Sequence, residues 1–142
     1  MLQKHNLDDP TPSSATINIR NLRLRTFIGF NPDETTKKQD VVINIEIRYA
    51  INSAVLQDRI EDALDYKVIT KKVIRHVEEG RFLLLEKLVS DVLALCRDHP
   101  SIQFSRVTID KPHALRFADS VSLTLEHRTA TADIHSILEK AS

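Results

Sequence analysis

Every second residue from Val41 to Tyr49 is apolar, and this run constrains the fold more than any other segment of the sequence. A strand points successive side chains to opposite faces of its sheet, so the alternation predicts a strand with one buried face and one face in water. The apolar members are Val41, Ile43, Ile45, Ile47 and Tyr49, and the polar members include Asn44, Glu46 and Arg48. The chain is therefore expected to build a sheet that is covered on one side only.

Five further segments have the patterns of two helices and three strands. Residues 16–28 predict a strand whose apolar parity changes near Asn21, which indicates a β-bulge or a bend. Asp65 can cap a helix that ends at Gly80, and a second helical pattern covers residues 83–97. Residues 106–110 and 120–126 alternate as strands. This order predicts an α+β fold, ββααββ, with a four-stranded antiparallel sheet and two helices on one face.

The 142 residues are expected to form a single domain, since one core commonly holds about 100–150 residues. The expected boundaries are a flexible N-terminal arm at 1–15, one domain at 16–128 and a C-terminal tail at 129–142. A four-stranded sheet leaves two bare edges, which proteins usually cover or pair. The polar second face and the open edges together predict that copies of the chain join edge to edge into a ring with a wet interior.

Charge and composition exclude several classes of function. Twenty Lys and Arg residues balance twenty Asp and Glu residues, which argues against nucleic acid as the main partner. The only glycines are Gly29 and Gly80, too few for a phosphate-binding loop or a dinucleotide fingerprint. No stretch approaches the roughly 20 apolar residues of a membrane span, and a single cysteine, Cys96, suits a reducing compartment. We expect no nucleic-acid partner, no membrane contact and a cytoplasmic location.

Metal and thiol chemistry are also disfavoured by the pattern of residues. The six histidines form no HxH or HExxH pair, and one cysteine cannot build a thiolate site. His76 lies three residues before Glu79, but a solvated helix face explains this pair better than a metal does. Cys96 falls on the apolar stripe of its helix, which favours a packing role. We therefore expect neither a metal-dependent mechanism nor a nucleophilic cysteine.

Four residues remain as candidates for chemistry, and each also has an ordinary structural explanation. Lys111 stands beside a proline just past a strand, where it is either a rigidly presented base or a solvated turn residue. Glu34 suits a surface carboxylate in the polar turn NPDET, and Tyr66 could simply pack at the start of its helix. Glu86 lies at the edge of an apolar stripe, either solvated or buried with a donor. A buried carboxylate there could bind the amino-amide edge of a pterin or a guanine.

Four segments together resemble the dihydroneopterin aldolase family, and most closely its epimerase branch. They are NLRLRTFIGFNPDE, EDALDYKVIT, RFLLLEKL and DKPHALRFADSVS, and the resemblance covers about residues 16–127. It implies the tunnelling fold of that family, whose four-stranded subunits assemble as tetramer rings that stack into octamers. It also implies active sites between subunits and a reaction that needs no cofactor.

The resemblance assigns a role to each residue that matches a family motif. Lys111 in DKPHA matches the base lysine, and Glu34 in IGFNPDE matches the glutamate that positions it. Tyr66 in LDYKV matches a proton-shuttling tyrosine that the neighbouring subunit supplies. Glu86 matches the glutamate that anchors the pterin, and Leu85 before it lines the pocket.

The reaction that the resemblance implies breaks and remakes the C1′–C2′ bond of 7,8-dihydroneopterin triphosphate, which inverts C2′ and gives dihydromonapterin triphosphate. A triphosphate needs cationic side chains to bind its oxygens. Arg116 is the first candidate, followed by Lys37, Lys38 and Arg25. Two alternatives stay open. One is an aldolase that uses the same residues to release 6-hydroxymethyl-7,8-dihydropterin and glycolaldehyde. The other is a module that binds a pterin or purine without catalysis.

Overall fold

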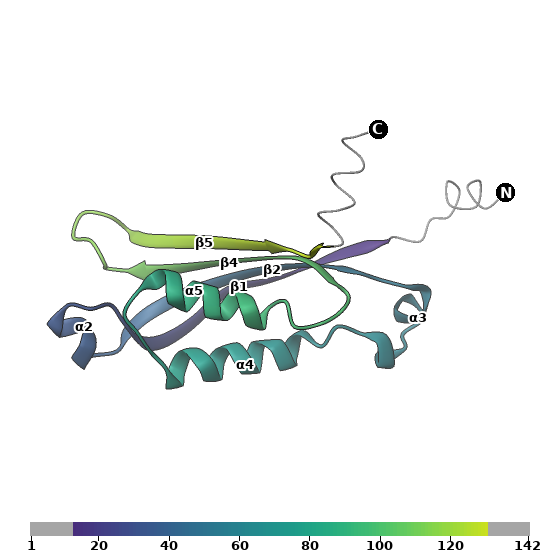
Figure 1. Cartoon of the computed structure of the whole chain (residues 1–142), viewed down its shortest axis with the longest axis horizontal. Coiled ribbons are helices and arrows are strands. Elements are labelled where there is room, and N and C mark those ends of the chain that lie inside the picture. The colour runs from purple at the N-terminus through teal and green to yellow at the C-terminus, as the bar shows by residue number, and fades with distance from the viewer. Residues whose placement is uncertain (1–12, 131–142) are drawn as a thin grey trace.

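The computed structural model describes residues 13–130, which form five strands, four α-helices and one 3-10 helix (Figure 1). The strands are β1 (Ser14–Ile28), β2 (Gln39–Ala50), β3 (Arg81–Phe82), β4 (Ile102–Pro112) and β5 (Ser120–Arg128). The helices are α2 (Pro32–Thr36), α3 (Ser53–Leu56), α4 (Tyr66–Glu79) and α5 (Leu85–Leu95), with the 3-10 helix η1 (Ile60–Asp62) before α4. The expected arm and tail lie outside the described residues, apart from residues 13–15 and 129–130.

The strands form one sheet in the order β3-β1-β2-β4-β5. Its three long ladders, β1 with β2, β2 with β4 and β4 with β5, are antiparallel, as the order of the predicted elements indicated. The expectation of four strands is corrected by β3, because Arg81 and Phe82 pair in parallel with Phe27 and Ile28 at the end of β1. Two residues are too few to show a periodic pattern, so this strand had no signature in the sequence.

A β-bulge in β1 changes which alternate residues of this strand point toward the core. It confirms the bulge that the change of apolar parity near Asn21 predicted. The ladder with β2 shifts register between Ile19 and Leu22. Asn21 adopts a positive φ of 55° there, and its backbone N–H donates to the Asn44 Oδ1 atom at 3.0 Å. The extra residue turns Leu24, and every second residue after it, toward the core.

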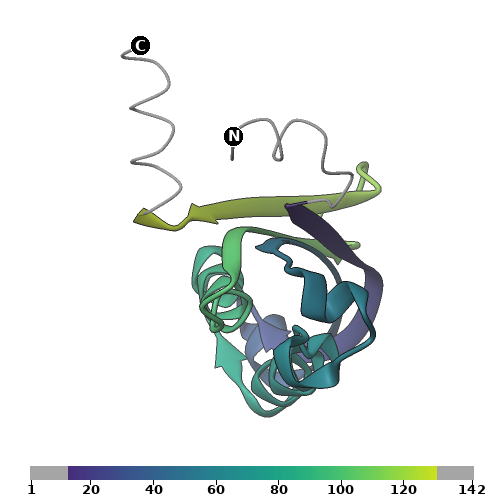
Figure 2. The same cartoon turned by 90° about the vertical axis from the view of Figure 1, so that its right-hand side faces the viewer.

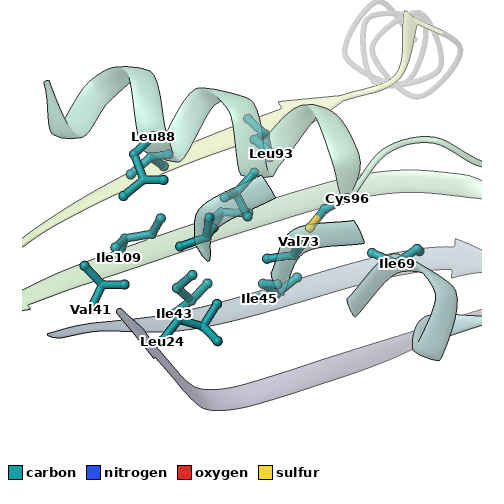
Figure 3. Close-up of a cluster of buried hydrophobic side chains, with 14 of the residues drawn as sticks. Leu24, Val41, Ile43, Ile45, Ile69, Val73, Leu88, Leu93, Cys96 and Ile109 are labelled. Carbon is teal, nitrogen blue, oxygen red and sulfur yellow. The ribbon is translucent and has the colours of Figure 1, made fainter. Parts of the chain in front are cut away.

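Helices α4 and α5 cover one face of the curved sheet (Figures 1 and 2). The core between these two layers contains Ile43 of β2, Ile109 of β4, Val73 of α4 and Leu88 of α5, all fully buried (Figure 3). Burial of each such side chain contributes about 1.5–3 kcal/mol to the free energy of folding. This shared core fixes the two ends of the sheet, where the candidate residues lie.

The two predicted helices are present with small differences in their bounds, whereas α2 was not predicted. Asp65 caps α4, since its Oδ1 accepts a hydrogen bond from the Lys67 backbone N–H at 3.1 Å, and Gly80 follows the last residue. The second predicted helix, α5, covers residues 85–95 rather than 83–97. The polar stretch after β1 was expected as a turn but contains α2, because Asn31 precedes a helix that starts with Pro32.

Candidate active site

Glu34 lies in the first turn of α2, directly beyond the end of β1. Pro32 starts this helix, and the Asn31 backbone N–H donates to Glu34 Oε1 at 3.4 Å. The turn from β1 into α2 depends on Gly29, whose φ is +120°. A Cβ atom at Gly29 would collide with the carboxyl group of Glu34, so only glycine leaves room for that group.

Lys111, near the end of β4, forms a direct ion pair with Glu34. Its Nζ atom donates to Glu34 Oε2 at 2.9 Å, and the two side chains are only 13% and 20% exposed. Gln39, the first residue of β2, donates to the same Oε2 at 3.2 Å and also to the Ile28 carbonyl. Lys111 and Glu34 are 77 residues apart in the chain, so the sheet is what brings them together.

The hydrogen bonds of this cluster favour the ionised form of Glu34. The bond from Lys111 has the largest effect, and those from Gln39 and Asn31 act in the same direction, while partial burial opposes them. The pKa of Glu34 therefore lies below its ordinary value. The carboxylate is negative at neutral pH and holds the Lys111 amine in place, as a general base or acid requires.

The short strand β3 supports the turn and the helix that carry Glu34. The Gly29 N–H donates to the Phe82 carbonyl at 2.9 Å. Arg81 donates from Nη1 to the Thr35 carbonyl at 3.2 Å, and its guanidinium lies 3.8 Å from the centre of the Phe27 ring. β3, which the sequence did not predict, thus holds both the turn before α2 and the last turn of α2.

Leu85 and Glu86 lie in the first turn of α5, at the same end of the molecule as α2 and β3 (Figure 1). Leu85 packs partly against the core, whereas Glu86 is exposed. Within residues 13–130, the Glu86 carboxylate makes no hydrogen bond and no ion pair. The sequence left two alternatives for the Glu86 carboxylate, which could be solvated or buried with a donor. In the single chain it is solvated, so its oxygens are available to a ligand or to a second chain.

Tyr66 lies at the other end of the molecule, at the start of α4 (Figure 1). The 14 residues of α4 span about 21 Å, and the far end of the helix leads into β3 beside the Lys111–Glu34 pair. Tyr66 is 47% exposed and lines a cleft of about 600 Å³ together with Ile17 and Asn18 of β1. Within one chain, therefore, Tyr66 does not reach Lys111.

Arg116 lies in the loop of residues 113–119 between β4 and β5. Its guanidinium is 5.5 Å from the centre of the Phe117 ring, and Phe117 is 94% exposed. The loop thus presents a cation to solvent five residues after Lys111, without a contact to that residue among those described. Lys38, another candidate for phosphate binding, donates to the Glu78 carbonyl at 3.2 Å.

Residues 13–130 contain no group of three or more His, Cys, Asp or Glu side chains placed to hold a metal ion. None of their helices is long and apolar enough to cross a membrane.

His76 meets Asp91 of α5 at 2.8 Å rather than Glu79, and Lys87 reaches the other oxygen of Asp91 at 2.9 Å. Burial raises the pKa of the Cys96 thiol to about 12, so the thiol stays protonated at neutral pH, as a packing role requires.

Gln39 and Gly29 belong to this site although the sequence analysis did not select them. Nothing about an isolated glutamine at the start of a strand predicts that it will hold a carboxylate. Gly29 had a usable signal, because a glycine between a strand and a proline-containing turn often marks a positive φ. Gln39 binds the Glu34 carboxyl group and Gly29 leaves room for it. Lys111 was identified from the sequence without either residue.

Comparison with known proteins identifies a family model and several relatives that match this chain. The family model FolB, dihydroneopterin aldolase, matches residues 17–126. A curated dihydroneopterin triphosphate 2′-epimerase from Pseudomonas aeruginosa is 52% identical over 114 residues, which are 80% of this chain and 93% of that protein. The protein of the same name from Escherichia coli K12 is 53% identical over 112 residues, 79% of this chain and 93% of its own.

Among solved structures, Escherichia coli dihydroneopterin aldolase in complex with neopterin matches with a TM-score of 0.73 and 30% identity. The match covers 80% of this chain and 98% of the aldolase chain. The residues that the family model matches include both Lys111 and Glu34. The chain belongs to the dihydroneopterin aldolase family.

Proposed function

We propose that this protein is an epimerase that inverts C2′ of 7,8-dihydroneopterin triphosphate and gives dihydromonapterin triphosphate. The observation that carries the chemistry is the largely buried Lys111–Glu34 pair, with 2.9 Å between Nζ and Oε2. The substrate is supported by identities of 52% and 53% to curated epimerases, compared with 30% to the aldolase structure. Family membership thus supplies the substrate class, and the ion pair supplies the base.

The reaction begins when a base removes the proton of the 2′-hydroxyl group. We assign this step to Lys111, directly or through a water molecule, because Glu34 fixes the position of its amine. The C1′–C2′ bond then breaks, and the deprotonated oxygen forms a double bond to C2′, which becomes an aldehyde carbon. The electrons of the broken bond move into the reduced pterin ring, which takes up a proton at N5. The ring itself is the electron sink.

Epimerisation requires the aldehyde to turn before the bond forms again. C1′ then adds to the opposite face of the aldehyde carbon, N5 loses its proton, and the new 2′-alkoxide takes a proton from Lys111 or Tyr66. In an aldolase the aldehyde leaves instead, C1′ takes up a proton while N5 loses one, and the ring fragment is released as 6-hydroxymethyl-7,8-dihydropterin. The two activities share their first step, so the escape of the aldehyde decides between them.

The complete site is shared between two copies of the chain in this proposal. A Tyr66 that assists Lys111 has to come from a neighbouring chain, because the two residues lie at opposite ends of one copy. The outer edge of β5 has no partner strand among residues 13–130, and the outer side of β1 is paired only at Phe27 and Ile28. Open edges of this kind favour pairing with another copy.

The assembly proposed is a tetramer ring of tunnelling-fold subunits, stacked as an octamer in the cytoplasm, with one catalytic domain over residues 16–128. Glu86 anchors the pterin, because its exposed oxygens can accept parallel hydrogen bonds from the ring amide and amino groups. Leu85 lines the pocket beside it. Arg116 binds the phosphates from the exposed loop at the same end of the sheet.

A product assay with 7,8-dihydroneopterin triphosphate tests the proposed function. After dephosphorylation and oxidation, chiral chromatography separates neopterin, monapterin and 6-hydroxymethylpterin. We expect mainly monapterin, whereas mainly 6-hydroxymethylpterin would make the protein an aldolase. Lys111→Ala is expected to abolish turnover and retain pterin binding. If the wild-type protein binds pterin without turnover, only the binding module remains.

Mixing two inactive variants tests the shared site. Lys111→Ala and Tyr66→Phe each remove one member of every site in a uniform assembly. In a random equal mixture, about a quarter of the sites combine an intact Lys111 with an intact Tyr66 from the neighbour. Co-refolding should therefore recover a corresponding part of the activity. No recovery in assemblies shown by mass spectrometry to be mixed would contradict a site between copies.

A further inference from the structure

A hollow of about 370 Å³ lies on the polar face of the sheet, at the same end as the Lys111–Glu34 pair. Its lining includes Arg23, Arg25, Asp40, Pro112 and His113. Two arginines and a histidine thus line the hollow together with a single aspartate. The surplus of hydrogen-bond donors and positive charge favours an anionic ligand.

Arg23 is the most available cation of this hollow. No other described residue forms a hydrogen bond or an ion pair with its guanidinium group. Arg25 is held in place, since Asp40 Oδ1 lies 3.4 Å from its Nη1 and the Lys38 carbonyl accepts from its Nη2 at 3.0 Å. Both arginines follow the bulge at Asn21 and are two residues apart, so they lie on the same face of β1. A free guanidinium beside a fixed one suits the oxygens of a phosphate.

His113 adopts a backbone conformation that disfavours a side chain. Its φ is +67°, in the left-handed region that glycine enters freely and a histidine enters at a cost. Such strain persists where the surrounding structure requires it, and it is concentrated at ligand-binding sites. Here the strained residue comes directly after the end of β4 and lines the hollow.

The hollow and the Lys111 amine lie on opposite faces of the same strand end. Pro112 lines the hollow, whereas Lys111 reaches Glu34 on the side of the helices, because successive residues of a strand point to opposite faces. β4 ends at Pro112 and β2 begins at Gln39, so neither strand continues past this point. A flexible chain of phosphates that leaves the substrate at Lys111 can pass around the strand ends into the hollow.

We propose that this hollow binds the triphosphate chain of the substrate, with Arg23 as its main phosphate ligand. The inference rests on the proposed function, since the pterin end must react at Lys111 for the phosphates to arrive here. Arg23, Arg25 and His113, together with Arg116 in the loop that His113 begins, then determine specificity, because they distinguish the triphosphate from unphosphorylated dihydroneopterin. The chemistry that they recognise is an oligophosphate anion.

Calorimetric titration with inorganic tripolyphosphate tests the hollow without any turnover. Arg20 is a matched control, since it is an exposed arginine of the same strand that does not line the hollow. We expect the wild-type protein and Arg20→Ala to bind alike, and Arg23→Ala to bind about tenfold more weakly or worse. Equal affinity of all three proteins, or no binding to the wild-type protein, would overturn the proposal.

His113→Gly is a second variant that separates folding from binding. Glycine accepts the positive φ and removes the imidazole, so the thermal midpoint should not fall while the tripolyphosphate affinity drops severalfold. An unchanged affinity would remove His113 from the hollow's function. A fall in the midpoint as large as that of an ordinary core substitution would contradict the strain argument.

Kinetics with two substrates distinguish the failure of this inference from the failure of the proposed function. For the triphosphate, Arg23→Ala should lower kcat/KM about tenfold through KM, and for dihydroneopterin it should leave kcat/KM unchanged. A parallel loss on both substrates would overturn the phosphate role and leave the epimerase standing. If the wild-type protein turns over neither substrate, the proposed function fails, and the titration still decides whether the hollow binds an oligophosphate.

Discussion

Gly29 offers a direct test of how the candidate site is held together. Gly29→Ala places a Cβ atom at a φ of +120°, where it would collide with the Glu34 carboxyl group. The backbone cannot easily move away, because the Gly29 N–H is bound to the Phe82 carbonyl at 2.9 Å. We therefore expect the Glu34 side chain to move and to lose its contact with Lys111.

Two effects set the expected magnitude. A residue with a Cβ atom pays about 1–3 kcal/mol for such a backbone conformation. Loss of a charge-assisted hydrogen bond adds about 1 kcal/mol once the partial exposure of the pair is allowed for. The free energy of unfolding should fall by about 2–4 kcal/mol in Gly29→Ala. Activity should fall about 100-fold, because the base is no longer held in place.

A double-mutant cycle with Glu34→Ala identifies the cause. Without the Glu34 carboxyl group the three atoms nearest to the new Cβ atom are gone, and no hydrogen bond to Lys111 remains to be lost, so Gly29→Ala should cost about 1 kcal/mol less in that background. Urea unfolding at a fixed protein concentration measures the stability term, and kcat/KM with the triphosphate measures the activity term. Strict additivity in both would refute the reasoning that Gly29 acts through Glu34.

Three further predictions concern single residues. The pKa of Glu34 is lowered in the folded protein, chiefly by Lys111, so the stability it contributes is complete above its unfolded pKa and is lost as the pH falls through the folded one. The difference in unfolding free energy between the wild-type protein and Glu34→Gln should therefore shrink below about pH 4.3, and a constant difference would contradict the ion pair. Cys96, with a pKa of about 12, should resist Ellman's reagent in the folded protein and react fully in denaturant; rapid labelling of the native protein would contradict its burial. Arg116→Ala should raise KM for the triphosphate more than for dihydroneopterin, and an equal loss for both would remove Arg116 from phosphate binding.

The long elements could be predicted because their side chains report a buried face directly. The alternation in β2 and the parity change at Asn21 both follow from which residues must avoid water. α2 was missed although Asn31, Pro32 and Glu34 form a recognisable helix start, because its polar composition equally suits a turn. β3 was not predictable at all, since two residues carry no period.

The site was predictable in its residues and much less in its arrangement. Lys111 and Glu34 follow from the family resemblance, but their contact depends on strand register across 77 residues, which no local pattern encodes. Gln39 was missed because its role exists only once β2 lies beside α2. The separation of Tyr66 from Lys111 depends on the direction of α4, which the order of elements alone did not specify.

Deletion of a single residue at Asn21 should do more damage than any single substitution in β1. The bulge holds one residue more than β2 opposite it, so without that residue one half of the strand or the other must turn over. If the second half turns, Leu24 faces water while Arg23 and Arg25 enter the core. The length of β1 should therefore tolerate change less than most of its side chains do, and insertions or deletions should be tolerated in the loop of residues 113–119 before they are tolerated in this strand.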